Sequence, residues 1–183
     1  MIVKETKLKG CFVIEPKIFE DERGYFFESF NQDKFNQAIG TEVNFIQDNE
    51  SLSSKGVLRG LHFQKGSFAQ AKLVRVIQGE VLDVAVDLRI NSETFGKHIS
   101  ERLSGENKKQ FFVPRGFAHG FVVLSDTAIF SYKCDNYYNK ESEGGIIYND
   151  KSLNIDWEFP LEHAQLSEKD LVLPTFEAYL NEE

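Results

Sequence analysis

The nine residues GVLRGLHFQ, Gly56 to Gln64, place an arginine and a histidine inside a segment with the character of a β-strand. Burying a polar side chain costs free energy unless it finds a partner, so Arg59 and His62 require an explanation. Histidine has an ordinary pKa that suits proton abstraction near neutral pH, which makes His62 a candidate general base. Strand alternation puts Arg59 and His62 on opposite faces, so both serve one pocket only if Gly60 introduces a bulge or a twist.

A second set of ionisable residues lies in the segment KLVRVIQGEVLDVAVDL. A two-residue turn at Gly79 and Glu80 would make this segment a hairpin in which Val76 pairs with Asp83. One face would be nearly all apolar, and the other would carry Lys72, Val74, Val76, Asp83 and Asp87. This pattern alone leaves two interpretations open, a solvent face with a salt bridge or a cavity lined with ionisable groups.

Alternation along Thr127–Cys134 favours the cavity, because Tyr132 shares a face with Ala128, Phe130 and Cys134. An imidazole, an ammonium and a phenol suit the removal of a proton beside a carbonyl, stabilisation of the enolate and reprotonation from another direction. Each residue alone has an ordinary explanation, since a buried histidine or tyrosine usually only anchors a hydrogen bond. Three ionisable residues at interior positions favour a functional site.

The elements that would position these residues are short and mostly extended. Turn signals recur about every ten residues, and this spacing favours an all-β sandwich or barrel. We predict one helix at Gln32–Ala38, capped by Asn31 with Phe35 facing the core, and a helical turn at Leu166–Leu171. The predicted strands are Gly10–Ile14, Tyr25–Phe30, Val43–Gln47, Val57–Gln64, Ala71–Gln78, Val81–Arg89, Lys97–Leu103, Gln110–Val113, His119–Leu124 and Thr127–Cys134.

Composition excludes several classes of protein. The 183 residues suit a single domain, residues 1–183, and the net charge of −8 argues against a nucleic-acid partner. The N-terminus has no apolar leader and no run approaches membrane-spanning length, so we expect a cytoplasmic protein without membrane contact. Cys11 and Cys134 are isolated, which predicts neither a zinc site nor a disulfide framework.

A metal site competes with the proton-transfer interpretation, because PRGFAH, Pro114 to His119, resembles the second motif of the cupin superfamily. The first cupin motif requires G-x5-H-x-H and a later glutamate. Gly56 and His62 fit that motif, but Gln64 stands at the second histidine position and no glutamate follows before Glu80. Losing two of four ligands leaves no site for a first-row metal, so we expect a metal-free cupin fold.

Nearly the full length of the chain resembles the dTDP-4-dehydrorhamnose 3,5-epimerases. The matching segments are DERGYFFESF, FIQDNESLS, GVLRGLHFQ, QAKLVRVIQGEVLDVAVDLR, FGKHISERLSGENKKQFFVPRGFAHGFVVLSD, FSYKCDNYY and LSEKD. The resemblance implies a jelly-roll fold, no cofactor, a homodimer with an exchanged N-terminal strand, and a role in making activated sugars for surface polysaccharide.

The resemblance also implies roles for individual residues. His62 would remove the protons at C3 and C5, supported by Asp170; Lys72, oriented by Asp83, would hold the enolate charge; and Tyr132 would reprotonate from the opposite side. Tyr138 would stack on thymine, and Arg23 would reach into the partner's site. The family's substrate-binding positions correspond to Arg23, Glu28, Gln47, Asn49, Arg59, His119, Tyr138, Glu143 and Lys169.

Three functions follow from the sequence as hypotheses. The first is epimerisation at C3 and C5 of dTDP-4-dehydro-6-deoxy-D-glucose, giving dTDP-4-dehydro-L-rhamnose in dTDP-rhamnose biosynthesis. The second is epimerisation of a single carbon, or of another nucleotide-4-keto sugar. The third is a non-catalytic, sugar-binding cupin, which the combination of His62, Lys72, Tyr132 and Asp170 disfavours.

Overall fold

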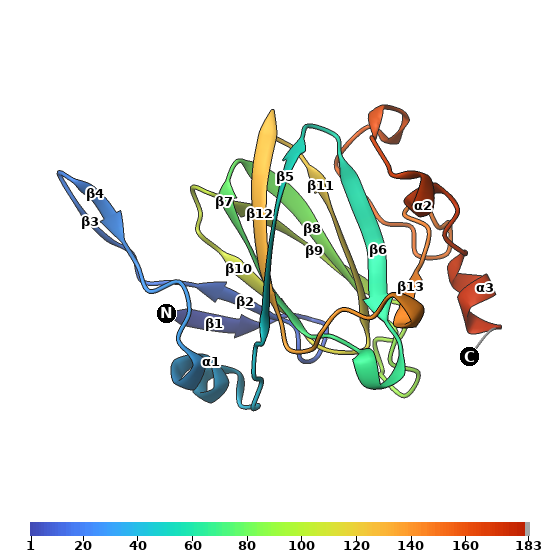
Figure 1. Cartoon of the computed structure of the whole chain (residues 1–183), viewed down its shortest axis with the longest axis horizontal. Helices are drawn as coiled ribbons and strands as arrows, with labels where there is room; N and C mark the ends of the chain where they lie inside the picture. Colours follow the sequence, from blue (N-terminus) through green and yellow to red (C-terminus); the bar gives the residue numbers. More distant parts are fainter. Residues whose placement is uncertain (182–183) are drawn as a thin grey trace.

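The computed structural model describes residues 1–181, which form two antiparallel sheets packed face to face (Figure 1). The first sheet has the order β1 (Ile2–Glu5), β2 (Phe12–Glu15), β10 (Gln110–Val113), β7 (Lys72–Gln78), β12 (Thr127–Cys134) and β5 (Gln47–Ser54). The second has the order β13 (Glu143–Gly145), β6 (Leu58–Gln64), β11 (Phe117–Val123), β8 (Glu80–Asp87) and β9 (His98–Ser104). The prediction of an all-β jelly-roll sandwich is confirmed.

Helices are short and lie outside the sheets (Figure 1). They are α1 (Gln32–Ile39), α2 (Glu168–Leu171), α3 (Phe176–Leu180), and three 3-10 turns η1 (Gly66–Phe68), η2 (Lys140–Ser142) and η3 (Leu161–His163). The Asn31 side chain accepts a hydrogen bond from the backbone of Lys34 and Phe35 is buried, as predicted for α1. No helix among residues 1–181 is long and apolar enough to cross a membrane.

Three layers of apolar side chains hold the fold together. The inner layer fills the space between the sheets and includes Val74, Val81, Phe111 and Phe130. The outer face of the second sheet is covered by the C-terminal segment, with Trp157 at its centre, and α1 covers part of the outer face of the first sheet. Burial of apolar surface on three levels fixes both sheets, and therefore the residues that project between them.

The predicted hairpin at Gly79 is wrong. β7 pairs with β10 and β12, whereas β8 pairs with β9 and β11, so Gly79 connects one sheet to the other. A Cβ at this position would lie 2.0 Å from the carbonyl oxygen of Thr127, and φ is +80°. The alternation still indicated the correct face, because Val74 and Ala85 both lie in the core between the sheets.

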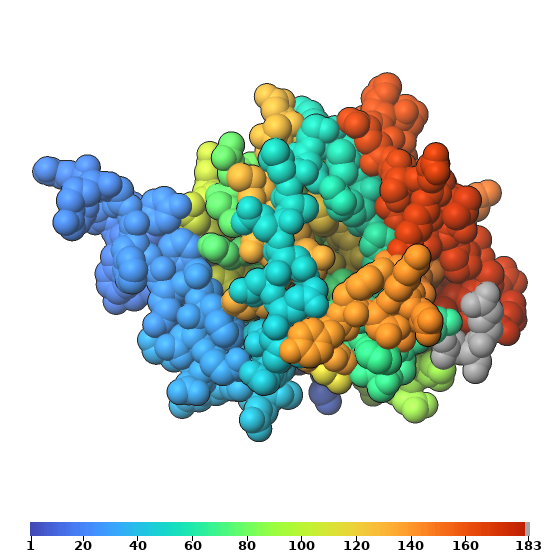
Figure 2. Space-filling view, viewed as in Figure 1, coloured from blue at the N-terminus to red at the C-terminus, as the bar shows by residue number. Residues whose placement is uncertain are grey.

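Two other predicted strands differ from the structure. The strand expected at Val43–Gln47 lies instead at Gln47–Ser54. The residues of β5 are mostly polar, yet every one of them has a partner in the antiparallel strand β12. The strand expected at Tyr25–Phe30 is limited to β4 (Gly24–Phe26), which pairs with β3 (Phe19–Asp21). These two strands form a hairpin, residues 19–26, that we call the arm; it projects away from the body of the molecule (Figures 1 and 2).

Gly60 gives β6 the irregularity that the sequence required. The register between β6 and β11 shifts between His119 and Phe121, opposite Gly60, and the φ of Gly60 is +123°. A Cβ on Gly60 would lie 2.6 Å from the Cα atom of Gly120. The bulge allows Arg59 and His62 to line the same cavity despite their spacing.

We expect Gly60→Ala to lower the free energy of unfolding by about 2–4 kcal/mol, because the added methyl group meets backbone that cannot move aside. Gly40→Ala is the matched control, since Gly40 has a φ of +71° but open space around its Cα atom. That control should cost about 1 kcal/mol, the cost of the left-handed conformation alone. If denaturant unfolding showed that both variants lose the same free energy of unfolding, this would contradict the close contact between Gly60 and Gly120.

Candidate active site

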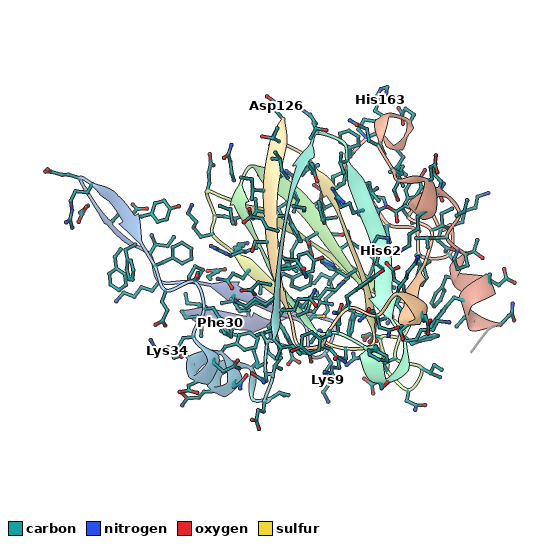
Figure 3. All side chains as sticks on the ribbon, in the orientation of Figure 1. Lys9, Phe30, Lys34, His62, Asp126 and His163 are labelled. Carbon is teal, nitrogen blue, oxygen red and sulfur yellow. The ribbon has the colours of Figure 1, made fainter. Side chains whose placement is uncertain are left out.

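A cavity of about 440 Å³ lies between the sheets and is closed on one side by the C-terminal segment. Both sheets contribute ionisable side chains to its walls, so one space collects residues that are far apart in the sequence. Figure 3 places His62 on β6, inside the body and far from the arm. Of the predicted site residues, those that line the cavity are Arg59, His62, Lys72, His119, Tyr132, Lys169 and Asp170.

His62 is held by a carboxylate from the far end of the chain. Its Nε2 atom lies 2.5 Å from Oδ1 of the buried Asp170, on α2. Burial tends to raise the pKa of Asp170, but hydrogen bonds with His62 and Ser167 outweigh it and hold that pKa below its ordinary value. An ionised carboxylate only accepts hydrogen bonds, so Nε2 donates and the lone pair of Nδ1 remains available to take a proton.

Lys72 and Tyr132 project from neighbouring strands of the opposite sheet. Nζ of Lys72 lies 5.9 Å from the centre of the Tyr132 ring. Burial lowers the pKa of Lys72, although the nearby charges of Asp83 and Glu143 favour the ammonium form. Burial also raises the pKa of Tyr132, so its phenol keeps its proton at neutral pH. The cavity therefore receives an imidazole from one sheet, and an amine and a phenol from the other.

Asp83 acts on Lys72 through its charge and forms its hydrogen bond with another residue. Its hydrogen bond runs to His119, with Nε2 of His119 and Oδ1 of Asp83 2.8 Å apart, and not to Lys72. Oδ2 of Asp83 has no hydrogen-bond partner within residues 1–181, and burial raises the pKa of this carboxyl. Asp83 thus holds the ring of His119 on the neighbouring strand β11, while its charge acts on Lys72 in the opposite sheet.

Four predicted substrate-binding residues do not line the cavity but are connected to it by hydrogen bonds and one ion pair. The side chain of Gln47 donates to Asn49 and accepts from the backbone N–H of Tyr138, and the Tyr138 hydroxyl donates to Glu143 at 3.1 Å. Glu143 forms an ion pair with Lys169, which lines the cavity. These four predicted substrate-binding residues therefore lie together, and Tyr138 is 56% exposed.

Two predicted site residues lie away from the cavity of their own chain. Arg23 is on the arm, where its guanidinium pairs with Asp21 at 2.5 Å. Glu28 lies beyond the arm and binds Lys34 at 2.8 Å. Neither residue lines the cavity described above, so within one chain the site lacks both of them.

The ligand set for a metal is also incomplete. Among residues 1–181, no group of three or more His, Cys, Asp or Glu side chains is arranged to hold a metal ion. His62 and His119 are each bonded to a carboxylate instead.

Some lining residues were not predicted from the sequence. Ser167 caps α2 by accepting a hydrogen bond from the backbone of Asp170, and the pattern Ser-x-x-Asp before a helical turn is a signal that could have found it. Gln165 lines the cavity because its backbone forms a parallel bridge with Val57. A contact between residues 57 and 165 leaves no local signal in either segment.

Comparisons with known proteins agree on one family. The family model for dTDP-4-dehydrorhamnose 3,5-epimerase matches residues 5–178. A Pseudomonas aeruginosa protein of that name is 57% identical over 171 residues, covering 92% of this chain and 93% of the relative.

Solved structures agree with the sequence comparison. An epimerase of the same name from Elizabethkingia anophelis is 61% identical, with a TM-score of 0.94 and 97% of each chain covered. A dTDP-6-deoxy-D-glucose-3,5-epimerase from Legionella pneumophila, in complex with dTDP-4-keto-L-rhamnose, is 50% identical, with a TM-score of 0.92 and coverage of 96% of this chain and 93% of that one. The chain therefore belongs to the dTDP-4-dehydrorhamnose 3,5-epimerase family.

Proposed function

We propose that this enzyme inverts C3 and C5 of dTDP-4-dehydro-6-deoxy-D-glucose and so produces dTDP-4-dehydro-L-rhamnose for dTDP-rhamnose biosynthesis. One observation carries the proposal: His62, bonded to Asp170, shares a cavity with Lys72 and Tyr132 from the opposite sheet. The reaction moves only protons, so it is redox-neutral and requires no cofactor.

His62 is the base in this proposal. The C4 ketone acidifies the C–H bonds at C3 and C5, and Nδ1 of His62 takes the proton from each in turn. The carboxylate of Asp170 supports the imidazolium that forms and fixes the ring. The electron pair of the broken C–H bond moves into the enolate, whose negative charge lies on the C4 oxygen.

Lys72 stabilises that oxygen. An ammonium group in a cavity with little water interacts strongly with a developing charge, and removal of one such donor typically costs about 3–4 kcal/mol of barrier. Tyr132 then gives its phenolic proton to the carbon from the side of the other sheet. Proton removal and return from opposite sides invert the carbon. Before the second carbon reacts, the imidazolium of His62 gives its proton to water and the phenolate of Tyr132 takes one from water.

The remaining predicted residues bind the nucleotide. Arg59, His119 and Lys169 lie on the cavity wall and supply donors to sugar and phosphate oxygens. Gln47, Asn49 and Glu143 complete the binding site, and Tyr138 offers an aromatic face on which thymine stacks. The net charge of −8 gives no basis for a nucleic-acid partner, and we propose that the enzyme acts in the cytoplasm.

We propose that the active unit is a homodimer in which each arm completes the partner's site. The arm carries exposed apolar rings, among them Phe26 at 70% exposure, and the outer face of the first sheet exposes Leu52 at 68%. Apolar surface of this kind favours association with another protein surface. Exchange of the arm would bring Arg23 to a cavity that its own chain does not let it reach.

Solvent deuterium exchange tests the reaction. In D2O we expect the wild type to incorporate deuterium at C3 and C5 of the substrate, and His62→Asn to slow exchange at both by about 10²–10⁴-fold. Tyr132→Phe should still exchange through His62 but lose inversion, whereas the matched control Tyr148→Phe, outside the cavity, should behave as wild type. Deuterium at C3 alone would favour a single-carbon epimerase, and no exchange would contradict the proposal.

The pH–rate profile tests the charge of Lys72. Because burial lowers its pKa, the ammonium is lost as pH rises, and we expect kcat/KM to fall with an apparent pKa below 10.5. The arginine of Lys72→Arg keeps its charge at every accessible pH. The fall of kcat/KM at high pH should therefore move above pH 10 in this variant, because burial raises the pKa of Tyr132 above its ordinary value of 10.0. The same alkaline decline in both proteins would show that Lys72 is not the titrating group.

Subunit complementation tests the exchanged arm. His62→Asn and Arg23→Ala chains are each expected to be impaired, but a mixed dimer contains one site with His62 from one chain and Arg23 from the other. Random reassociation should therefore restore about one quarter of the wild-type activity. Activity equal to the sum of the two separate variants would mean that Arg23 serves its own chain or no site.

A further inference from the structure

Gln64 is a buried amide whose hydrogen-bonding groups all bind backbone. It ends β6, two residues after His62, and is 8% exposed. Its Nε2 atom donates to the carbonyl oxygens of Phe68 at 2.7 Å and Tyr137 at 3.1 Å, and its Oε1 atom accepts from the N–H of Asn139 at 2.6 Å. In the proposed mechanism this side chain has no part.

Two of these three bonds lie on either side of Tyr138. The carbonyl of Tyr137 and the N–H of Asn139 belong to the residues before and after it, and the same amide binds both. The N–H of Tyr138 itself donates to Gln47 at 3.3 Å, and its hydroxyl donates to Glu143. Since Tyr138 is 56% exposed, these polar bonds are what fixes the position of its ring.

Only a primary amide suits this position. The side chain at this position must donate two hydrogen bonds, to two backbone carbonyls, and accept one, from a backbone N–H. Glutamine can do this, whereas an ionised carboxylate has no hydrogen to donate. A histidine, the residue that the cupin motif carries here, has one donor on each ring nitrogen at most and cannot bind all three backbone groups from one end of the side chain. Gln64, which stands where the cupin motif has a metal-binding histidine, thus anchors the loop of residues 137–139 instead.

We propose that Gln64 is a positioning residue for the nucleobase: it anchors residues 137–139 to the strand that carries His62 and so holds Tyr138 as a rigid stacking surface. The inference rests on the proposed binding of thymine by Tyr138. A base that stacks on Tyr138 is placed relative to the catalytic strand, because Gln64 and His62 lie on β6. Loss of the anchor weakens binding of the nucleotide and leaves the proton-transfer groups in place.

The experiment compares a ligand that has a base with one that has none. Gln64→Met removes all three bonds at similar volume, and Gln64→Glu keeps the bond from Asn139 and serves if the first variant does not fold. Gln70→Met is the matched control, since Gln70 donates one bond to the carbonyl of Asn136 in the same loop. Calorimetry measures the affinity of each protein for dTDP and for inorganic pyrophosphate.

We expect both Gln64 variants to bind dTDP about tenfold more weakly and pyrophosphate unchanged, since a tenfold change is about 1.4 kcal/mol, no more than the loss of two or three hydrogen bonds supplies. KM should rise by about the same factor with kcat within about twofold, because only binding changes. In a Tyr138→Ala background, Gln64→Met should weaken dTDP binding no further. Gln70→Met should resemble the wild type.

Equal weakening of dTDP and pyrophosphate, or full additivity with Tyr138→Ala, would overturn the inference. Hydrogen exchange without ligand separates it from the proposed function: residues 137–139 should exchange faster in Gln64→Met than in Gln70→Met, and unchanged exchange would show that Gln64 does not hold the loop. If the wild-type protein bound pyrophosphate more tightly than dTDP, this would contradict the stacking of thymine on Tyr138. The nucleobase part of the inference would then fail as well, even if hydrogen exchange of residues 137–139 were faster in Gln64→Met.

Discussion

The hydrogen bond between His62 and Asp170 is the contact on which the rest of the site depends. It joins the middle of β6 to a short helix near the end of the chain, over a separation of 108 residues. Because Asp170 is ionised, the bond occupies one ring nitrogen and leaves the lone pair of the other free. The C-terminal segment thus both covers the second sheet and fixes the ring of His62.

The two sheets divide the chemistry between them. β6 and β11 bring His62 and His119 to one wall, each bonded to a carboxylate, while β7 and β12 bring Lys72 and Tyr132 to the other. A planar enolate requires this arrangement, since its oxygen needs a cation and its two faces need separate proton carriers. Close packing of the apolar core between the sheets keeps the walls at a fixed distance.

Local patterns predicted most of the strands, and the resemblance to a known family supplied the proposed site residues. Alternation placed Tyr132 and Lys72 on inner faces correctly, and Asn31 predicted the start of α1. The same alternation could not distinguish a hairpin at Gly79 from a connection between sheets, since both give the same faces. β5 was placed too early because its inner face is polar, and the bond from Asp83 to His119 depends on strand order that no local pattern contains.

The tautomer of His62 tests the central claim most directly. Nitrogen-15 NMR of the imidazole at a pH where the ring is neutral distinguishes a proton on Nε2 from one on Nδ1. We predict the proton on Nε2, shared with Asp170, and an unprotonated Nδ1. A proton on Nδ1 would mean that the free lone pair points at Asp170, and His62 could not then be the base described above.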